Sequence, residues 1–202
     1  MKLLLCAAFV FAFGADAGRA QKFDYYVFTL SWSPEFCHEN PSNPTPECSP
    51  GAKGGFVAHG LWPNRNDGSD PTNCPAQPFN PSAVPQGFEA VMPGGIWRHE
   101  WMKHGVCTGM SESDYFGKIA ALYRQIAIPI HNTGGDQQIS PAALREQFAR
   151  ANPAWPIGSF AIQDNGRYLV AVKICLGRTL LPMACPRPGD TRTTPIVIRG
   201  GV

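Results

Sequence analysis

The sequence predicts a single α+β domain in which an antiparallel sheet has helices packed to one side. Segments rich in β-branched and aromatic residues lie at both ends of the chain, and helical patterns lie between them. This segregation favours an α+β fold over a parallel sheet with alternating helices. With 202 residues and 44% hydrophobic content, the chain is long enough for one domain with a sizeable core. An even set of cysteines in the expected mature chain indicates that disulfides stabilise this domain.

The first 20 residues are expected to form an export signal. A lysine precedes an apolar run over residues 3–13, and small residues allow cleavage after Ala17 or after Ala20. The run is too short to span a bilayer, and no later stretch approaches the roughly 20 apolar residues that a membrane helix needs. We therefore expect a mature domain over residues 21–202 that is secreted or periplasmic and has no membrane anchor.

The N-terminal part of the mature chain is expected to hold two strands separated by a loop. Residues 23–30, FDYYVFTL, are rich in the aromatic and β-branched residues typical of strands. A proline-rich loop covers residues 37–55. A short strand over residues 55–59 then ends at His59, where Gly60 allows the chain to turn away. A second loop follows this turn.

Three helices are expected in the middle of the chain. The first is expected to begin near Gly95, the second at Ser111 or Ser113 and the third at Ser140. The serines are suited to cap a helix, and apolar residues at helical spacing follow them. The first helix should end near His104 and the second near Ile126. The third carries Pro141 at its first position, where proline is favoured.

The C-terminal third of the chain returns to strand character. A hairpin is expected from residues 160–163 and 168–176. Asp164, Asn165 and Gly166 lie between these segments and favour a tight turn. Residues 194–198 are expected to form a final strand.

Six cysteines remain once the export signal, which carries Cys6, is removed: Cys37, Cys48, Cys74, Cys107, Cys175 and Cys185. An even number in an exported chain favours disulfides, although many pairings are possible and the sequence alone does not choose among them. A structural zinc site is disfavoured, because no two cysteines have CxxC or CxxxxC spacing. We expect neither a metal nor a cofactor.

The charge balance excludes a protein that coats nucleic acid through a broad basic surface. The formal net charge is +2, and only 16% of the residues are charged. Proteins that bind long stretches of nucleic acid electrostatically carry much more positive charge. Any nucleic acid must therefore be bound at a local site.

The segment over residues 97–107, WRHEWMKHGVC, carries the densest set of chemically active side chains. At about 100° per residue, four of them share one helix face about 140° wide: His99, Glu100, Lys103 and His104. Charged faces are often merely solvated, but two histidines beside a glutamate and a lysine favour a functional site. Catalytic zinc is disfavoured, because the histidines do not have the HExxH spacing and a lysine would repel the cation.

A third histidine lies in the segment over residues 56–63, FVAHGLWP, where His59 follows a strand. A lone histidine in such a place is more often structural than catalytic. Together with the helix, however, it fits general acid–base catalysis on a phosphodiester, in which one group takes a proton from the attacking hydroxyl and another gives one to the leaving oxygen. Histidine titrates in the range that suits both tasks, and a lysine and a further histidine suit the negative phosphoryl oxygens.

The two segments, HGLWP at 59–63 and HEWMKHGVC at 99–107, together resemble the two catalytic segments of the ribonuclease T2 family. The resemblance covers most of the mature chain and becomes weaker after about Asn132. With the sequence VMP at 91–93 before the second segment, the chain looks closest to bacterial members.

The resemblance implies a role for each residue of the site. His59 and His104 would be the acid and the base. Glu100 with Lys103 would stabilise the phosphorane-like transition state, and His99 would bind phosphate.

The resemblance also implies that Trp62 stacks on a base, a contact that contributes about 1–3 kcal/mol. The alternative is a tryptophan of the core. Members of the family often have an aspartate two residues later, where this chain has Asn64, so the base preference is left open. For the cysteines, the implied disulfides are Cys37–Cys48, Cys74–Cys107 and Cys175–Cys185, of which the second would tie the first loop to the catalytic helix.

The implied reaction is metal-independent endonucleolytic cleavage of single-stranded RNA with low base specificity. The ribose 2′-hydroxyl attacks its own phosphate, and the resulting 2′,3′-cyclic phosphate is hydrolysed to a 3′-phosphate; DNA lacks this nucleophile. RNA is then the expected partner, and we expect a monomer with no obligate protein partner. The alternative is an inactive secreted protein that binds RNA or another ligand on the same fold, and the competent residues at every catalytic position argue against it.

Overall fold

The computed structural model describes residues 22–42, 45–49, 52, 54–76 and 78–201. The expected export signal at residues 1–20, with its cleavage after Ala17 or Ala20, lies outside the described residues. Both expected catalytic segments lie within them.

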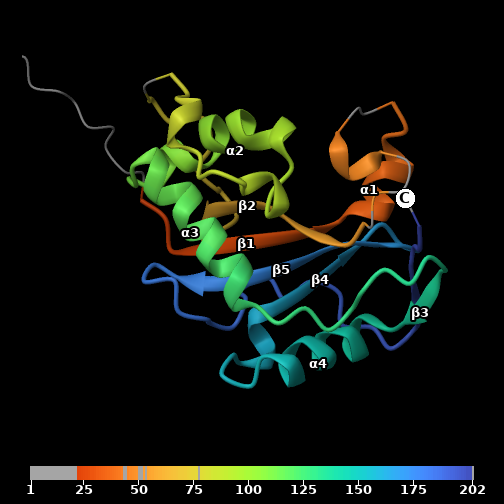
Figure 1. Cartoon of the computed structure of the whole chain (residues 1–202). Coiled ribbons are helices and arrows are strands. Elements are labelled where there is room, and N and C mark those ends of the chain that lie inside the picture. The colour runs from red at the N-terminus through yellow and green to blue at the C-terminus, as the bar shows by residue number, and fades with distance from the viewer. Residues whose placement is uncertain (1–21, 43–44, 50–51, 53, 77, 202) are drawn as a thin grey trace, which may run out of the picture.

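A four-stranded antiparallel sheet forms the centre of the fold (Figure 1), in the order β2-β1-β5-β4. Its strands are β1 (Tyr25–Trp32), β2 (Phe56–Asn64), β4 (Phe160–Asp164) and β5 (Leu169–Gly177). The strand predicted over residues 23–30 is present as β1, displaced toward the C-terminus, and the predicted hairpin is present as β4 and β5. The antiparallel α+β fold predicted from the sequence is therefore confirmed.

Two further strands, β3 (Gln137–Ile139) and β6 (Ile196–Ile198), pair in a separate antiparallel ribbon. β6 lies within the segment predicted as the final strand. The sequence analysis missed β3, because its sequence, QQI, holds a single apolar residue. A strand this short is stable only through its partner and its packing.

Within the described residues, the helices are α1 (Ser33–Glu39), α2 (Trp97–Lys103), α3 (Glu112–Gln125) and α4 (Pro141–Ala151). The Oγ atoms of Ser111 and Ser140 accept hydrogen bonds from the backbone N–H groups of Asp114 and Ala143. These bonds satisfy N–H groups that a helix start leaves free. The predicted starts of α3 and α4 are thus confirmed.

The remaining two helices depart from the expectation. α2 is preceded by a 3₁₀ turn, Gly94–Ile96, and begins at Trp97 instead of Gly95. α1 was not predicted, because it carries Pro34 and leads into a proline-rich loop. Proline is nevertheless tolerated in the first turn of a helix, where no intrahelical N–H bond is lost.

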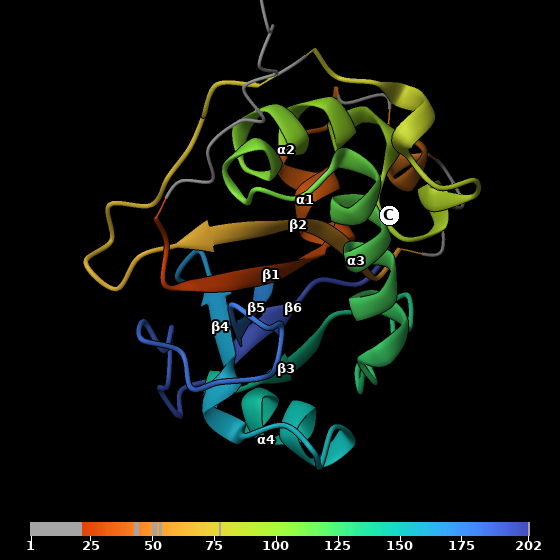
Figure 2. The ribbon, with the colours of Figure 1, turned by 90° about the vertical axis from the view of Figure 1, so that its left-hand side faces the viewer.

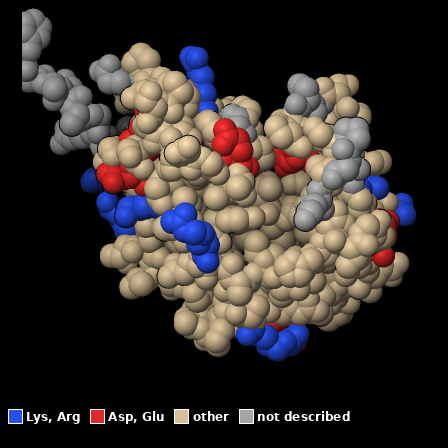
Figure 3. Space-filling model, viewed as in Figure 1, with Lys and Arg blue, Asp and Glu red and all other residues tan. Residues whose placement is uncertain are grey.

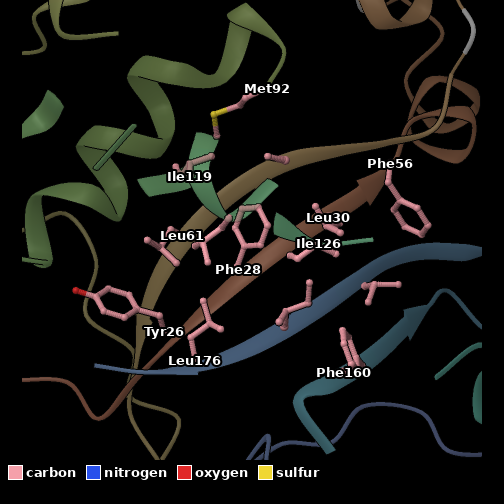
Figure 4. Packing of buried hydrophobic residues seen from close by; sticks show 14 of the residues in the cluster. Tyr26, Phe28, Leu30, Phe56, Leu61, Met92, Ile119, Ile126, Phe160 and Leu176 are labelled. Atoms are coloured by element: carbon pink, nitrogen blue, oxygen red, sulfur yellow. The ribbon is translucent and has the colours of Figure 1, made fainter. Parts of the chain in front are cut away.

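The main core lies between the sheet and the helices α3 and α4. Alternate residues of β1 point to this face and are buried: Tyr26, Phe28, Leu30 and Trp32. Figure 4 shows Phe28 and Leu61, which pair across β1 and β2, beside Ile119 of α3. Phe148 of α4 contacts Phe56 at 5.7 Å between ring centroids. The helices α3 and α4 therefore cover one face of the sheet, as predicted, while α2 lies at its β2 edge (Figure 2).

The opposite face of the sheet carries a smaller cluster and a cavity. Tyr25, Val27 and Cys175 are buried there, with Trp62 and Met183 packed against them. The cavity next to this cluster has a volume of about 460 Å³ and is lined by residues of all four strands. This face is therefore left open for a ligand beside Trp62.

The disulfides of the described chain join Cys37 to Cys48, Cys74 to Cys107 and Cys175 to Cys185. These are the pairings that the resemblance implies. Cys107 lies in the 3₁₀ turn Gly105–Cys107 that follows α2. Cys74 lies after β2, so this disulfide ties the loop after β2, and not the first loop, to the end of that helix.

The surface carries no continuous positive region on the face shown in Figure 3, where blue and red atoms form separate small groups. This distribution agrees with the small net charge of +2. Within the described ranges, none of the helices has the length and apolar character needed to cross a bilayer. Nor do these residues contain a group of three or more histidine, cysteine, aspartate or glutamate side chains arranged to hold a metal ion.

Candidate active site

A β-bulge in β2 brings His59 and Trp62 to the same face of the sheet. The pairing of β1 with β2 shifts between Thr29 and Leu30, which makes His59 the extra residue of β2. Side chains alternate along a regular strand, so residues three positions apart would point to opposite faces. One extra residue reverses the alternation, and both side chains therefore point to the open face.

Gly60 lies inside β2 and not at a turn. The expectation that the chain turns away at Gly60 is wrong, because β2 continues to Asn64. A Cβ atom at Gly60 would overlap a carboxylate oxygen of Glu100 and the indole nitrogen of Trp62. The glycine is needed for the close approach of these two side chains.

Both ring nitrogens of His59 have partners. Nδ1 lies 2.9 Å from Oγ of Ser31 on β1, and Nε2 lies 3.3 Å from Oε1 of Glu100 on α2. The side chain is 33% exposed. The imidazole is thus held in one orientation while part of the ring remains accessible.

Glu100 connects the two expected catalytic segments. Its side chain is 1% exposed, and its Oε2 accepts a hydrogen bond of 2.7 Å from Nε1 of Trp62. A carboxylate at this depth is tolerated only with such partners. Glu100 therefore fixes Trp62 and His59 relative to each other.

His104 is the C-cap of α2, and its ring stacks on Trp62 with 5.1 Å between centroids. Its Nδ1 is buried and lacks a hydrogen-bond partner among the described residues. Burial lowers the pKa of His104 to about 4, with Glu100 opposing the shift and the charges of Lys103 and His99 adding to it. His104 is therefore a neutral base over most of the acidic range.

His99 and Lys103 line a hollow of their own, about 410 Å³ in volume, together with Arg98. The sequence analysis expected all four active side chains of α2 to share one face. The face is about 140° wide, and its side chains point in two directions. His99 and Lys103 line this hollow, whereas Glu100 and His104 contact His59 and Trp62. Lys103 and His99 still act on His104 through their charges.

Trp62 contacts both imidazoles. Its ring lies 5.6 Å from His59 in an edge-on arrangement and 5.1 Å from His104 in a stacked one. It also packs on the buried cluster of Tyr25 and Val27, and it lines the cavity of the open face. Trp62 is only partly buried, so part of its indole faces the space where a ligand would lie.

Asn64 is held by Asp70. Its Nδ2 donates to Oδ2 of Asp70 at 2.8 Å, and Arg187 donates to the same carboxylate at 2.8 Å. Oδ1 of Asn64 is buried and has no hydrogen-bond partner in the described part of the chain. The amide is thus fixed beside the cavity with an acceptor left free.

Several polar residues around the site were not predicted from the sequence: Ser31, Arg98, Lys173 and Arg187. Strand alternation places Ser31 on the same face as Val27 and gives a signal for it. Arg187 lies in the irregular C-terminal segment, where no periodicity indicates a direction.

The sequence model of the ribonuclease T2 family matches residues 23–147, which include β1, β2, α2 and α3. This chain belongs to the ribonuclease T2 family. The match contains both segments that meet at Glu100, and it ends within α4.

Individual members of the ribonuclease T2 family resemble the chain over different lengths. A ribonuclease of Aeromonas hydrophila is 43% identical over 109 residues, or 54% of this chain and 48% of that protein, so the chain spans about half the length of this relative. Ribonuclease S-7 of Pyrus pyrifolia is 30% identical over 189 residues, or 82% of each protein.

The fold of the ribonuclease T2 family is also found among solved structures. A variant of RNase MC1, a protein from bitter gourd seeds, was crystallised with 5′-UMP. It is similar to this chain with a TM-score of 0.70 and 23% sequence identity, covering 87% of this chain and 98% of its own. At this identity the similarity shows a shared fold, including the part after residue 147.

Proposed function

We propose that this chain is an endoribonuclease that cleaves single-stranded RNA through a 2′,3′-cyclic phosphate to 3′-phosphate products, with low base specificity and without a metal. The observation that carries the proposal is the meeting of two imidazoles, His59 and His104, around one indole and one buried carboxylate. Cleavage by the 2′-hydroxyl requires one group to accept a proton and another to donate one. Membership of the ribonuclease T2 family supports the same chemistry.

The environments of the two histidines support a different role for each. Burial lowers the pKa of His104 to about 4, so this imidazole is neutral and accepts the proton of the 2′-hydroxyl. His59 faces the carboxylate of Glu100 at 3.3 Å. From this position His59 gives a proton to the leaving 5′-oxygen, and the carboxylate holds the ring in place for that step. Hydrolysis of the cyclic phosphate then reverses the two roles.

The remaining side chains act on charge and on position. Lys103 and His99 line a hollow on the flank of α2 and bind the phosphoryl oxygens from there. Glu100 with Lys103 stabilises the phosphorane-like transition state, in which preorganised charges are most effective. Trp62 stacks on a base of the substrate.

The expected partner is RNA alone. We propose that the protein is a monomer with a mature domain over residues 21–202, secreted or periplasmic after removal of the export signal. Its small net charge suits a local substrate site more than an extended nucleic-acid surface.

One assay tests this function. The purified protein is incubated with RNA in EDTA, and the ends of the products are identified. We expect 2′,3′-cyclic phosphates followed by 3′-phosphates, no cleavage of DNA of the same sequence, and near-complete loss of turnover in His59→Ala and in His104→Ala. RNA binding without cleavage would contradict the proposal in favour of an inactive binding protein, and abolition by EDTA with recovery on adding zinc would contradict its mechanism.

A further inference from the structure

The cavity on the open face of the sheet extends from Trp62 across to β4. Its floor is formed by side chains that point away from α3 and α4: Tyr25, Val27, Ala161, Lys173 and Cys175. This floor is mostly apolar, and the one charged side chain within it belongs to Lys173. Trp62 connects the cavity to the two imidazoles, because it lines the cavity and contacts both rings.

Strand register places Lys173 close to the catalytic segment. Lys173 lies opposite Thr29 of β1, and Thr29 lies opposite Gly60 of β2, the residue after His59. With about 4.8 Å between neighbouring strands, the Cα atoms of Lys173 and Gly60 are about 10 Å apart. At this separation, the ammonium group of Lys173 can reach a nucleotide adjacent to the scissile phosphate.

Lys173 is distinguished from the other charged groups of the cavity by its lack of an ion-pair partner. The carboxylate of Asp70 is paired with Arg187 at 2.8 Å. The other two aspartates that line the cavity are both paired with Arg192. Among the residues that the structure describes, no carboxylate forms an ion pair with Lys173.

The negative charge near Lys173 does not offset the effects of its burial and of the nearby Arg187. Burial lowers the pKa of Lys173, Arg187 lowers it further by repulsion, and Asp70 offsets part of the shift. The ammonium lies 5.8 Å from the ring centroid of Trp62, a weak cation–π contact at best. Partly buried lysines are normally paired or extend their ends into water, whereas a bound anion would supply the missing partner here.

We propose that Lys173 binds a backbone phosphate of RNA next to the scissile phosphate, on the side of the nucleotide whose base stacks on Trp62. This inference rests on the proposed function, because it names a further contact to the same substrate. Lys173 lies about two strands away from His59 and acts on substrate binding, not on the reacting atoms.

The test compares a parent substrate with two derivatives, each of which carries one additional phosphate. A dinucleoside monophosphate carries only the scissile phosphate, and two derivatives of it carry an additional 5′-terminal or 3′-terminal phosphate. For the wild-type protein we expect one of the two additions to raise kcat/KM about tenfold, as one charge-assisted contact would. In Lys173→Gln this ratio should fall to about one, and in Lys173→Arg, which keeps the charge, most of it should remain.

Lys118→Gln is the matched control. Lys118 is exposed on α3, and its replacement removes the same charge outside the cavity, so the ratio should stay at its wild-type value. An unchanged ratio in Lys173→Gln overturns the inference even if activity on all three substrates falls, because the lysine would then only support Trp62. The absence of any gain in the wild-type protein overturns it as well.

A binding measurement separates this inference from the proposed function. In a His59→Ala background, which cannot turn over substrate, calorimetry compares a nucleoside 3′,5′-bisphosphate with the corresponding monophosphates. A loss of about tenfold in affinity confined to the bisphosphate on adding Lys173→Gln supports the phosphate contact, even if the wild-type protein cleaves no RNA. Equal affinities with and without Lys173 overturn the contact while leaving the cleavage reaction standing.

Discussion

Glu100 places two different groups with one carboxylate. One oxygen lies 3.3 Å from Nε2 of His59, and the other accepts the 2.7 Å hydrogen bond from Trp62. Because the side chain is 1% exposed, these contacts form in surroundings where water competes little. Glu100→Gln keeps the shape but loses the charge, so we expect it to lower turnover less than His59→Ala or His104→Ala does.

The charges around His104 predict the acid limb of the pH profile. With a pKa of about 4, His104 loses its proton as the pH rises through this value, so kcat/KM should rise there. Lys103 lowers this pKa and Glu100 raises it. Lys103→Gln should therefore move the acid limb to higher pH, and Glu100→Gln should move it to lower pH.

The measurement is kcat/KM against pH for the wild-type protein and the two variants. The direction of each shift is independent of how far each variant lowers the maximal rate. Shifts in the same direction for both variants, or a limb that does not move, would contradict the assignment of His104 as the base.

At the level of secondary-structure elements, the bulge of β2 and the end of α2 form the site together. The bulge turns His59 and Trp62 to one face, and α2 ends so that Glu100 and His104 reach them from the β2 edge. Two features hold these elements together. One is the close packing of Glu100 and Trp62 against Gly60 in β2, and the other is the Cys74–Cys107 disulfide after α2.

Gly60→Ala should disrupt this junction. The added Cβ would overlap Glu100 and Trp62, and overpacking of this kind costs about 1–3 kcal/mol. We expect a lower Tm and a loss of most activity, measured by thermal unfolding and kcat/KM. Gly117→Ala in α3 is the control, since a Cβ there meets nothing within 4 Å and alanine favours the helix. Wild-type activity in Gly60→Ala would contradict the close packing of the site.

Two of the disulfides should differ in their effect on activity. Cys74–Cys107 has a sequence separation of 33 residues and ends three residues after His104, whereas Cys37–Cys48 has a separation of 11 and belongs to neither of the two expected catalytic segments. Replacing either pair by serines should lower the free energy of unfolding by about 2–4 kcal/mol. Only the loss of Cys74–Cys107 should also reduce kcat/KM below the melting range. Equal activities of the two variants would show that this disulfide does not position α2.

At the scale of the whole molecule, charge is balanced and the substrate site is local. The net charge is +2, and the face in Figure 3 lacks a continuous positive region. The one open face of the sheet is bounded by paired arginines and aspartates, which limit the number of free cations available to RNA.

A shallow salt dependence should follow from this arrangement. Each phosphate contact to a single strand contributes about 0.7 to the slope of log affinity against log salt, so about three contacts give a slope near 2. The measurement is KM for an oligonucleotide over a range of salt concentrations. A slope several times steeper would indicate an extended basic surface, which is absent from the face shown in Figure 3.

Much of the fold follows from local sequence signals. The aromatic and β-branched residues of FDYYVFTL, the caps at Ser111 and Ser140 and the turn residues after β4 are all local signals, and each element that they predict is present. Helix α1 and strand β3 escaped prediction. A proline and an apolar-poor triplet give weak local signals, and these two elements depend on their contacts with the rest of the chain.

The residue types and spacing of the two segments, together with their resemblance to the ribonuclease T2 family, predicted which side chains form the candidate site: His59, Glu100 and His104. Only the tertiary structure decided how these residues meet. Register between strands determines the bulge at His59, and the docking of α2 against β2 determines that Glu100 faces the histidine while Lys103 faces another hollow. The place of Lys173 beside Trp62 likewise depends on pairing between strands far apart in the chain, which periodicity along a single segment does not encode.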